Sequence, residues 1–566
     1  MSNKGKQDIT VISVIFTLLG GIASAVYVSR FLEKKRKRRE EALEEAKLHA
    51  FYKLETLRSS STGVAPGNLN KPAGTLLTDV KIDEVYLWEV EHLGKKFKSE
   101  APPSLVNHMH GVDYHSASLP ENPPTFLRAL SGMSGADLQT SLHEGDDTIK
   151  KESKTHYNKL IGVNECIIAD IVRRPGYAST SKAFVRAGPR RNLHFNPKTV
   201  NAAIVTCGGL CPGLNNVIRE ITNSLIFMYG VKGKVYGIRG GYKGFYDPEY
   251  PPVILTPAIV ENIHHGGGTV LSSSRGGFDL DKIVAFIEKM RIKQLYVIGG
   301  DGTHRGAFTI HEGCLEKGLN VAVAGIPKTI DNDVDHIDRS FGFQSSVEAA
   351  QDAIRCAKTE AACNLPNGVG IVKLMGRSAG FIAAYATLGS GDVDLCLLPE
   401  VPIVLEGEIG CLPHLYKRVK QKGYAVVVVA EGAGEDILGT SVETDASGNK
   451  KLPAIGEFMK KATEEYFKKQ GETATVKYID PSYMIRSVPA NAADSLYCMQ
   501  LAQNAVHGAM AGFTGFSVGL CKNKMVFLPI PQLVATSPRM MNNRGRTYER
   551  LLATTRQPNT VPSHII

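Results

Sequence analysis

The chain has 566 residues, with a hydrophobic fraction of 43%, a charged fraction of 22% and a formal net charge of +10. This length predicts more than one folded part, and the ordinary composition disfavours both a wholly disordered chain and a polytopic membrane protein. Much of the positive charge is local, in the run KKRKRR at residues 34–39. No zinc-finger, helix-turn-helix or RNP-like pattern accompanies it, which disfavours nucleic-acid binding. The ten cysteines form no CxxC pair, which indicates reduced thiols in a reducing compartment.

An apolar segment near the N-terminus predicts a membrane anchor. Residues 9–28 carry no charged side chain and are long enough to cross a bilayer as a helix. Because the basic run follows this segment, the positive-inside rule places everything after residue 30 in the cytosol. Residues 1–30 are therefore predicted to be a signal-anchor that tethers a cytoplasmic protein to membrane lipid. A cleaved signal peptide is the alternative, since Ala23-Ser24-Ala25 resembles a cleavage site.

Two further segments precede the region of regular patterning. Residues 31–75 are expected to form a charged helical stalk and a flexible linker, because helix-favouring charged residues give way to turn-forming ones. Residues 76–160 mix one strand-like run, VYLWEVEHL, with polar and proline-rich stretches. We assign no chemistry to this extension.

From residue 199 onward, short apolar runs alternate with glycine-rich turns and helix-favouring segments. Repeated units of this kind predict a doubly wound α/β sheet that binds ligands at the carboxyl ends of its strands. The expected strands begin the stretches NAAIVTCGG, KVYGIRGG, GTVLSSSRGG, QLYVIGGDG, VAVAGIPKT, GVGIVKLMG and YAVVVVAEG.

The turns after these strands carry residues suited to binding phosphate. GGLCPG, ahead of a helix expected near Leu214, lacks a dinucleotide fingerprint, and the chain has no P-loop. Backbone N–H groups there could bind an anion, although a plain strand-to-helix turn is equally compatible. In GGDGT, glycines surround Asp301, which suits a Mg²⁺ ion that bridges phosphates. The alternative is an aspartate that caps the next helix.

The stretch PKTIDND predicts acid–base chemistry. Thr329, Asp331 and Asp333 alternate, so an extended or turning segment could present them to one cavity. A carboxylate there could accept the proton of an alcohol during phosphoryl transfer. Three arginines expected at other glycine-adjacent strand ends, Arg275, Arg377 and Arg486, are candidates for binding phosphate charge.

Together these motifs resemble the phosphofructokinase family. GGLCPGLN, GGYKGFY, SSSRGG, GGDGT, PKTIDND, MGRSAGF, AEG and YMIR occur in the family's order, and the chain is similar to plant- and protist-type ATP-dependent members over roughly residues 163–530. The resemblance implies an α/β fold of two doubly wound Rossmann-like subdomains with the active site in the cleft between them, preceded here by the N-terminal helical membrane anchor. The catalytic region would be residues 161–540, with the ATP part mainly at 199–335, the sugar-phosphate part mainly at 336–500, and a C-terminal tail at 541–566. Family members are generally dimers or tetramers, which implies a homo-oligomer.

The resemblance also implies a reaction. With Mg²⁺, the γ-phosphoryl group of ATP would pass to the 1-hydroxyl of fructose 6-phosphate. Asp331 would accept the hydroxyl proton beside Thr329, Arg377 and Arg275 would stabilise the phosphoryl charge, and Asp301 would hold the metal. The implied ATP positions are Gly209, Tyr242, Arg275, Gly276, Gly300, Asp301, Gly302 and Thr303. The implied sugar-phosphate positions are Thr329, Ile330, Asp331, Met375, Gly376, Arg377, Glu431, Tyr483, Met484, Ile485 and Arg486.

Two positions bear on the phosphoryl donor. In the family, a glycine at Gly302 leaves room for the α-phosphate of ATP, whereas an aspartate goes with pyrophosphate. Lys328 is similar to pyrophosphate-dependent members, although plant-type ATP enzymes also carry a lysine there. The resemblance therefore favours ATP, with a pyrophosphate-dependent enzyme and an inactive membrane-tethered scaffold or sensor as alternatives.

Two departures from bacterial members limit what can be carried over. Those enzymes bring an arginine from a neighbouring subunit into the sugar-phosphate site, but no arginine lies between Arg355 and Arg377 here. Leu210 and Cys211 also replace the Asp and Ala of bacterial members. Although the family includes allosteric enzymes, neither the shared substrate site nor the bacterial effector site can be assumed for this chain.

Overall fold

The computed structural model describes residues 84–101, 160–162, 164–172, 180–439 and 452–562. The chain divides into two compact units, Met1–Asp79 and Val80–Ile566. The predicted anchor at residues 9–28 and the stalk and linker up to residue 75 lie outside the described residues. Among the residues described, none of the helices combines the length and the apolar character needed to span a bilayer.

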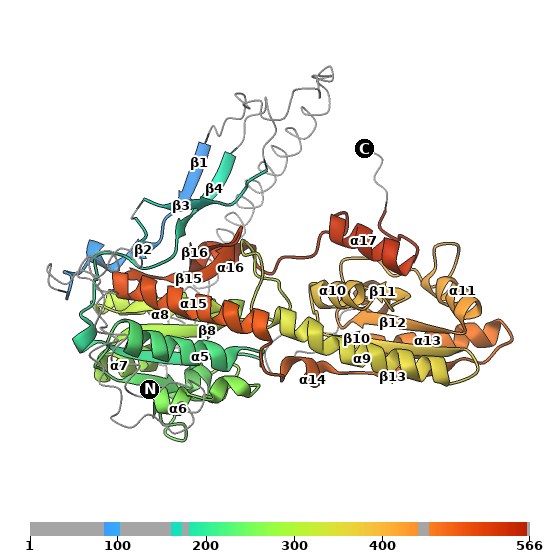
Figure 1. The fold of residues 1–566 in the computed structure, drawn as a ribbon, viewed down its shortest axis with the longest axis horizontal. Coiled ribbons are helices and arrows are strands. Elements are labelled where there is room, and N and C mark those ends of the chain that lie inside the picture. The colour runs from blue at the N-terminus through green and yellow to red at the C-terminus, as the bar shows by residue number, and fades with distance from the viewer. Residues whose placement is uncertain (1–83, 102–159, 163, 173–179, 440–451, 563–566) are drawn as a thin grey trace, which may run out of the picture. The chain divides into compact units, whose positions relative to one another are not determined.

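The second unit contains a large mixed sheet (Figure 1). Its described strands follow the order β1–β4–β16–β15–β9–β8–β5–β6–β7, with β3 beside β4. The central strands β5 (Asn201–Thr206), β8 (Ile292–Gly299) and β9 (Ala322–Pro327) are parallel and almost wholly buried. The other strands are β1 (Glu84–Trp88), β3 (Cys166–Ile168), β4 (Thr180–Arg186), β6 (Val235–Ile238), β7 (Val253–Ile254), β15 (Phe516–Cys521) and β16 (Lys524–Pro529).

Both faces of this sheet are covered by helices, as the alternation along β8 shows. Tyr296 and Ile298 belong to a core shared with α5 (Leu214–Asn223) and α15 (Ala492–Ala511). Leu295 and Val297 point to the opposite core, which α7 (Leu280–Lys289) and α8 (Asp301–Glu316) complete. Successive strand residues face opposite sides, so burial on both faces explains the unbroken apolar run. The strand predicted in QLYVIGGDG and the helix start predicted near Leu214 are confirmed.

The smaller sheet is parallel in the order β11–β12–β10–β13. It also has helices on both faces: α9 and α10 share one core with it, and α11 and α13 share the other. The strands are β10 (Gly368–Leu374), β11 (Leu395–Leu397), β12 (Tyr424–Ala430) and β13 (Thr475–Ile479). The helices are α9 (Phe343–Cys363), α10 (Phe381–Ser390), α11 (Cys411–Lys422), α13 (Ile455–Lys469) and the short α12 (Glu435–Leu438) and α14 (Ser482–Arg486).

Short elements complete the described chain. A two-residue pair joins β2 (Glu91–His92) to β14 (Phe513–Thr514), so the described residues 84–101 of the N-terminal extension pack on the catalytic region. The remaining helices are α6 (Pro257–Val260), α16 (Ile530–Thr536), α17 (Arg546–Thr555), a π-helix η4 (Ser224–Met228), and the 3₁₀ turns η1 (Leu93–Lys95), η3 (Pro197–Thr199), η5 (Gly241–Phe245) and η6 (Ile263–His265).

The larger sheet is not built from one continuous stretch of the chain, whereas the sequence predicted a continuous ATP part followed by a continuous sugar-phosphate part. The hairpin of β15 and β16 returns to the larger sheet, where β16 pairs antiparallel with β4. Residues 516–529 thus belong to the same sheet as residues 201–327, although the sheet that contains β10–β13 lies between them in sequence. One expected strand is also absent, because GTVL at residues 268–271 has no strand assignment.

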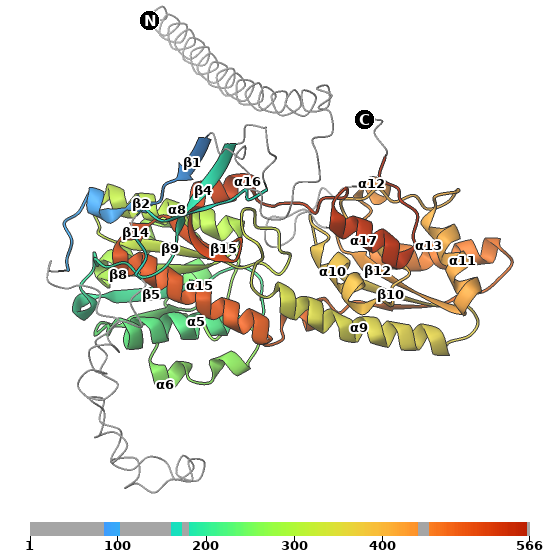
Figure 2. The ribbon, with the colours of Figure 1, turned by 45° about the horizontal axis from the view of Figure 1, so that its top comes forward.

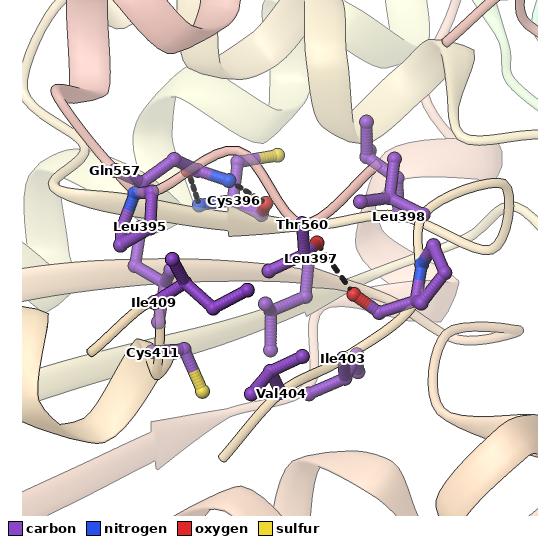
Figure 3. A pocket seen from close by; sticks show the side chains of 13 residues that line it. Leu395, Cys396, Leu397, Leu398, Ile403, Val404, Ile409, Cys411, Gln557 and Thr560 are labelled. Carbon is purple, nitrogen blue, oxygen red and sulfur yellow. Dashed lines mark hydrogen bonds between the residues drawn. The ribbon is translucent and has the colours of Figure 1, made fainter. Parts of the chain in front are cut away.

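The expected C-terminal tail is in fact partly packed structure. Helix α17 lies against α10, with Tyr548 and Leu551 buried (Figure 2). Beyond it, the Gln557 side chain accepts a hydrogen bond from Cys396 N at 2.7 Å and donates one to Cys396 O at 2.9 Å, as an added strand would (Figure 3). The pocket beside this contact has a volume of only about 20 Å³, which is room for roughly one water molecule. Local periodicity could not predict this packing, because the partners lie about 160 residues apart.

All ten cysteines are free, and seven of them are buried, as expected for reduced thiols. Burial raises the pKa of the Cys207 thiol to about 12. A thiol held protonated in this way is a packing residue and a poor nucleophile.

Candidate active site

Three turns of the larger sheet are joined by short hydrogen bonds next to the candidate ATP positions. Gly208 N donates to Ser274 O at 3.1 Å, and Ser273 Oγ donates to Gly208 O at 2.7 Å. Ser274 Oγ donates to Gly240 O at 2.5 Å. The turns after β5 and β6 and the turn that contains Arg275 therefore form one wall.

Two guanidinium groups converge at Gly209 in this wall. A Cβ at Gly209 would lie 3.5 Å from Arg275 Nη2 and 3.9 Å from Arg486 Nη1. Arg275 and Gly276 are exposed, so their surface is open to a ligand. The two arginines come from elements other than the strand ends that the sequence suggested: Arg275 lies in a turn between η6 and α7, and Arg486 ends α14.

Tyr242 connects this wall to the start of α8. Its hydroxyl donates to Thr303 O at 2.6 Å, and its ring lies edge-on to Phe278 with 5.2 Å between centroids. Burial raises the pKa of the Tyr242 hydroxyl, which keeps it a neutral donor. Tyr242 thus fixes the backbone of the GGDGT turn, while Phe278 remains 40% exposed.

The first turn of α8 presents a carboxylate beside open space. Gly300 is the N-cap residue, and Asp301 is the first helical residue. A Cβ at Gly302 would meet nothing within 4 Å. Partial burial, assisted by the Asp333 carboxylate, raises the pKa of Asp301 to about 6 against the opposing charge of Arg305.

His304, one turn along the same helix, fixes α8 on the sheet. Its Nε2 lies 3.0 Å from Ser517 Oγ on β15, and its Nδ1 lies 3.1 Å from Gly300 O. Burial lowers the pKa of His304 to about 4, so the ring is neutral at neutral pH. Sequence reasoning missed this residue, because its partner on β15 lies 213 residues away.

The loop that follows β9, residues 328–341, contains the candidate base, and we call it the acidic loop. The buried Lys328 ammonium donates to Gly209 O at 2.6 Å, which joins the loop to the turn after β5. Thr329 Oγ1 donates to Asp333 Oδ1 at 2.9 Å and accepts a hydrogen bond from Asp331 N at 3.1 Å. The Thr329 hydroxyl therefore holds the two aspartates in a fixed relation.

Asp331 is a half-buried residue whose carboxyl group has one buried, unsatisfied oxygen. Its Oδ1 is buried and has no hydrogen-bond partner. Burial, the Asp333 carboxylate and the Glu431 carboxylate raise the pKa of Asp331 to about 8, and the charges of Arg377 and Lys328 oppose this shift. A carboxylate held in this way is unusually basic and has a free lone pair, the two properties that a general base needs.

The ends of β10 and β12 form the opposite side of the site. Gly432 N donates to Gly376 O at 3.1 Å, and a Cβ at Gly432 would lie 1.7 Å from Arg377 O, so only glycine allows this close approach. Burial raises the pKa of Glu431, while Arg377 and Lys373 act in the opposite direction. A cavity of about 750 Å³ lies beside Arg377, at the carboxyl ends of β10, β11 and β12.

Helix α14 contributes the last of the predicted positions. The side chains of Tyr483 and Met484 are 74% and 73% exposed. The Arg486 guanidinium lies over the Tyr483 ring, 5.0 Å from its centroid. Ile485, at 1% exposure, and Ile330, at 6%, are core residues, so these two predicted positions offer almost no surface to a ligand.

Comparison with known proteins identifies the family. A family model described as phosphofructokinase matches residues 201–509, which is more than half of the chain. The chain belongs to the phosphofructokinase family.

Several curated members of this family are close in sequence. ATP-dependent 6-phosphofructokinase 7 of Arabidopsis thaliana is 51% identical over 379 residues, which cover 66% of this chain and 77% of that protein. The ATP-dependent 6-phosphofructokinase of Amycolatopsis methanolica is 47% identical over 383 residues, covering 66% of this chain and 83% of that protein. A solved pyrophosphate-dependent phosphofructokinase from Marinobacter aquaeolei matches with a TM-score of 0.53 at 19% identity, over 65% of this chain and 94% of that chain. At that identity the structure supports the shared fold alone.

The phosphofructokinase fold brings most of the predicted positions together. The charge interactions of Asp331 with Arg377 and Glu431, and the approach of Arg275 and Arg486 to Gly209, connect residues of the two sheets. Among the described residues no group of three or more His, Cys, Asp or Glu side chains forms a ready metal site. Asp301 and Asp333 nevertheless fit Mg²⁺, because each is a partly buried carboxylate and Mg²⁺ needs only one or two carboxylates when phosphates and water complete its shell.

Proposed function

We propose that this phosphofructokinase transfers the γ-phosphoryl group of ATP to the 1-hydroxyl of fructose 6-phosphate, which makes fructose 1,6-bisphosphate for glycolysis. The observation that carries the proposal is the Asp331 carboxyl group with its buried, unpartnered Oδ1, placed near Arg377 and Glu431. Curated relatives named ATP-dependent 6-phosphofructokinase at 47–51% identity support the reaction and the donor.

In this mechanism Asp331 accepts the proton of the 1-hydroxyl as the new oxygen–phosphorus bond forms. Its raised pKa makes proton acceptance favourable, and the nearby Arg377 keeps enough of it ionised to act. Arg377 and Arg275 stabilise charge on the transferred phosphoryl group, as guanidinium groups do for phosphates. Glu431 and Arg486 bind the sugar phosphate. Mg²⁺, held by Asp301 and Asp333, would neutralise the phosphate charges of ATP when bound.

Gly302 supports ATP as the donor. A Cβ at Gly302 would have no protein atom within 4 Å. This open space is room that the α-phosphate of ATP could use. The bond from Lys328 to Gly209 O keeps pyrophosphate as a second candidate donor, because it places an ammonium in the same wall.

The test is phosphorylation of fructose 6-phosphate by the full-length protein with Mg-ATP and, in parallel, with Mg-pyrophosphate. We expect activity with ATP alone. Activity with pyrophosphate alone would replace the donor in this proposal. Activity with neither would favour the scaffold or sensor alternative, in which the site binds sugar phosphate without turnover.

We also propose that residues 9–28 tether the enzyme to a membrane and that it forms a homo-oligomer. The support for the tether is the uncharged segment followed by a basic run. Deletion of residues 1–30 should move the protein from the membrane fraction to the supernatant while kcat stays within about twofold. Recovery of the intact, unprocessed full-length protein in the supernatant would contradict the tether. Light scattering of purified protein tests the oligomer, with a monomer mass as the contrary result.

A further inference from the structure

Residues 332–337 of the acidic loop are hydrogen-bonded to a segment that lies outside the residues matched by the family model. Residues 537–545, which we call the crossover segment, connect α16 on the larger sheet to α17 beside the smaller one (Figure 1). The family model ends at residue 509, so the comparison assigns no role to this segment.

Arg539 makes the main contacts between the crossover segment and the acidic loop. Its backbone N–H donates to Asp333 O at 2.7 Å. Its side chain donates from Nε to Asn332 O at 3.2 Å and from Nη1 to Ile337 O at 3.0 Å. The guanidinium also lies 5.2 Å from the centroid of the Phe381 ring. One arginine thus bonds three carbonyl groups of a single loop.

Neighbouring residues extend this contact. Ser537 Oγ accepts a hydrogen bond from Asp335 N at 3.1 Å. On the other side, Met541 N donates to Glu400 Oε1 at 2.8 Å, and the same carboxylate oxygen accepts from Gly380 N at 2.9 Å. The crossover segment is therefore bonded to the acidic loop and, through Glu400, to the turn that contains Arg377.

We propose that Arg539 is a positioning residue for phosphoryl transfer, because it fixes the backbone that aims Asp331 and Asp333. This inference rests on the proposed function. Since Asp331 Oδ1 has no hydrogen-bond partner, no hydrogen bond fixes the direction of that oxygen, and its aim depends on the backbone of the loop. Asn332, between the two aspartates, is in the left-handed region with φ of 56°, and its carbonyl is one that Arg539 holds. The guanidinium presents several donors in a fixed planar fork, which lets one side chain hold two separate carbonyls in a set geometry.

The test compares Arg539→Met and Arg539→Lys with the wild type in the full-length protein. We expect Arg539→Met to lower kcat about 100-fold, the cost of a base displaced by about 1 Å, while KM for both substrates changes less than threefold. Arg539→Lys keeps the charge but not the fork, so we expect a loss of about tenfold. The matched control is Arg546→Met on α17, whose arginine is largely exposed and pairs only with Glu549 by the bonds described; its kcat should stay within twofold.

A spectroscopic readout separates positioning from general destabilisation. Trp88, the only tryptophan in the chain, lies edge-on to His336 of the acidic loop, with 4.8 Å between ring centroids. At a temperature where the variants are folded, Trp88 emission should change in Arg539→Met, less in Arg539→Lys, and not in Arg546→Met. Because the emission is read well below the melting transition, the comparison does not depend on differences in melting temperature among the variants.

Two results would overturn the inference. If Arg539→Met keeps kcat within threefold of an active wild type, or loses activity only in proportion to its unfolded fraction, Arg539 has a structural role alone. If Arg539→Met does not fold, the same criterion applies to Arg539→Lys. An inactive wild type would instead defeat the proposed function, and this inference with it.

Discussion

The first turn of α8 and the acidic loop face the same candidate site, but they are held in different ways. At Gly302 a Cβ would meet nothing within 4 Å, whereas Lys328, Ile330 and Asn332 in the loop are all buried. The helix turn thus leaves open space for a ligand, whereas the loop is held by packing and charge. A substitution in the first should change catalysis alone, and one in the second should change catalysis and stability together.

The largest effect is expected at Asp331. Asp331→Asn removes the proton acceptor while it keeps the size of the side chain, so kcat should fall by about 10²–10⁴-fold. Steady-state assays with Mg-ATP and fructose 6-phosphate measure this. Turnover within about threefold of the wild type would exclude Asp331 as the base.

Gly302→Asp tests the first turn of α8, where the structure leaves open space. The carboxylate should fill the space available to ATP and repel its phosphates, so kcat/KM for ATP should fall at least tenfold. The helical position and the absence of a steric conflict predict an unchanged melting temperature. Gly302→Ala is the matched control, because it adds the Cβ without the charge and should retain most ATP use. Equal damage in both variants would contradict the charge explanation.

Melting temperatures measured over a pH series test the acidic loop. Because the folded pKa of Asp331 is raised to about 8, well above the ordinary value near 4, the folded state holds a proton that the unfolded chain releases between these pH values. This group therefore costs stability progressively as the pH rises from about 4 to about 8. The melting temperature of Asp331→Asn should match that of the ligand-free wild type near pH 4 and exceed it by at least ~2 °C at pH 8.5. A difference that shrinks with rising pH would be the contrary result.

The smallest expected effect concerns Tyr242, which connects the wall at Gly208 and Arg275 to the start of α8. Tyr242→Phe removes the bond to Thr303 O, and the free energy of unfolding should fall by about 1 kcal/mol. KM for ATP should rise about two- to fivefold, while KM for fructose 6-phosphate stays constant, since the lost bond lies on the nucleotide side. Urea unfolding and substrate titrations measure the two quantities. A larger change in KM for fructose 6-phosphate than in KM for ATP would contradict the placement of Tyr242 on the nucleotide side.

Much of the site was predictable from local sequence. Strand-then-turn patterns identified β8, β9, β10 and β12, and the motifs at their ends placed Asp301, Asp331 and Arg377. These signals are local because a buried parallel strand needs a continuous apolar run and a turn needs glycine. The same local evidence failed at GTVL and at α17, where the apolar residues pack without a strand or extend the core beyond the expected boundary.

The sequence by itself determined the family, the order of the phosphate-binding turns, the candidate base and the residue that bears on the donor. The tertiary structure decided which residues hold that chemistry in place. His304 with Ser517, Arg539 with Asn332 and Trp88 with His336 are pairs separated by about 200 residues or more. Contacts at such separations leave no periodic signal in a single sequence, because they depend on how the strands and the C-terminal crossover pack in space. The pKa of Asp331 was decided in the same way, since burial and neighbouring charges exist only in the folded chain.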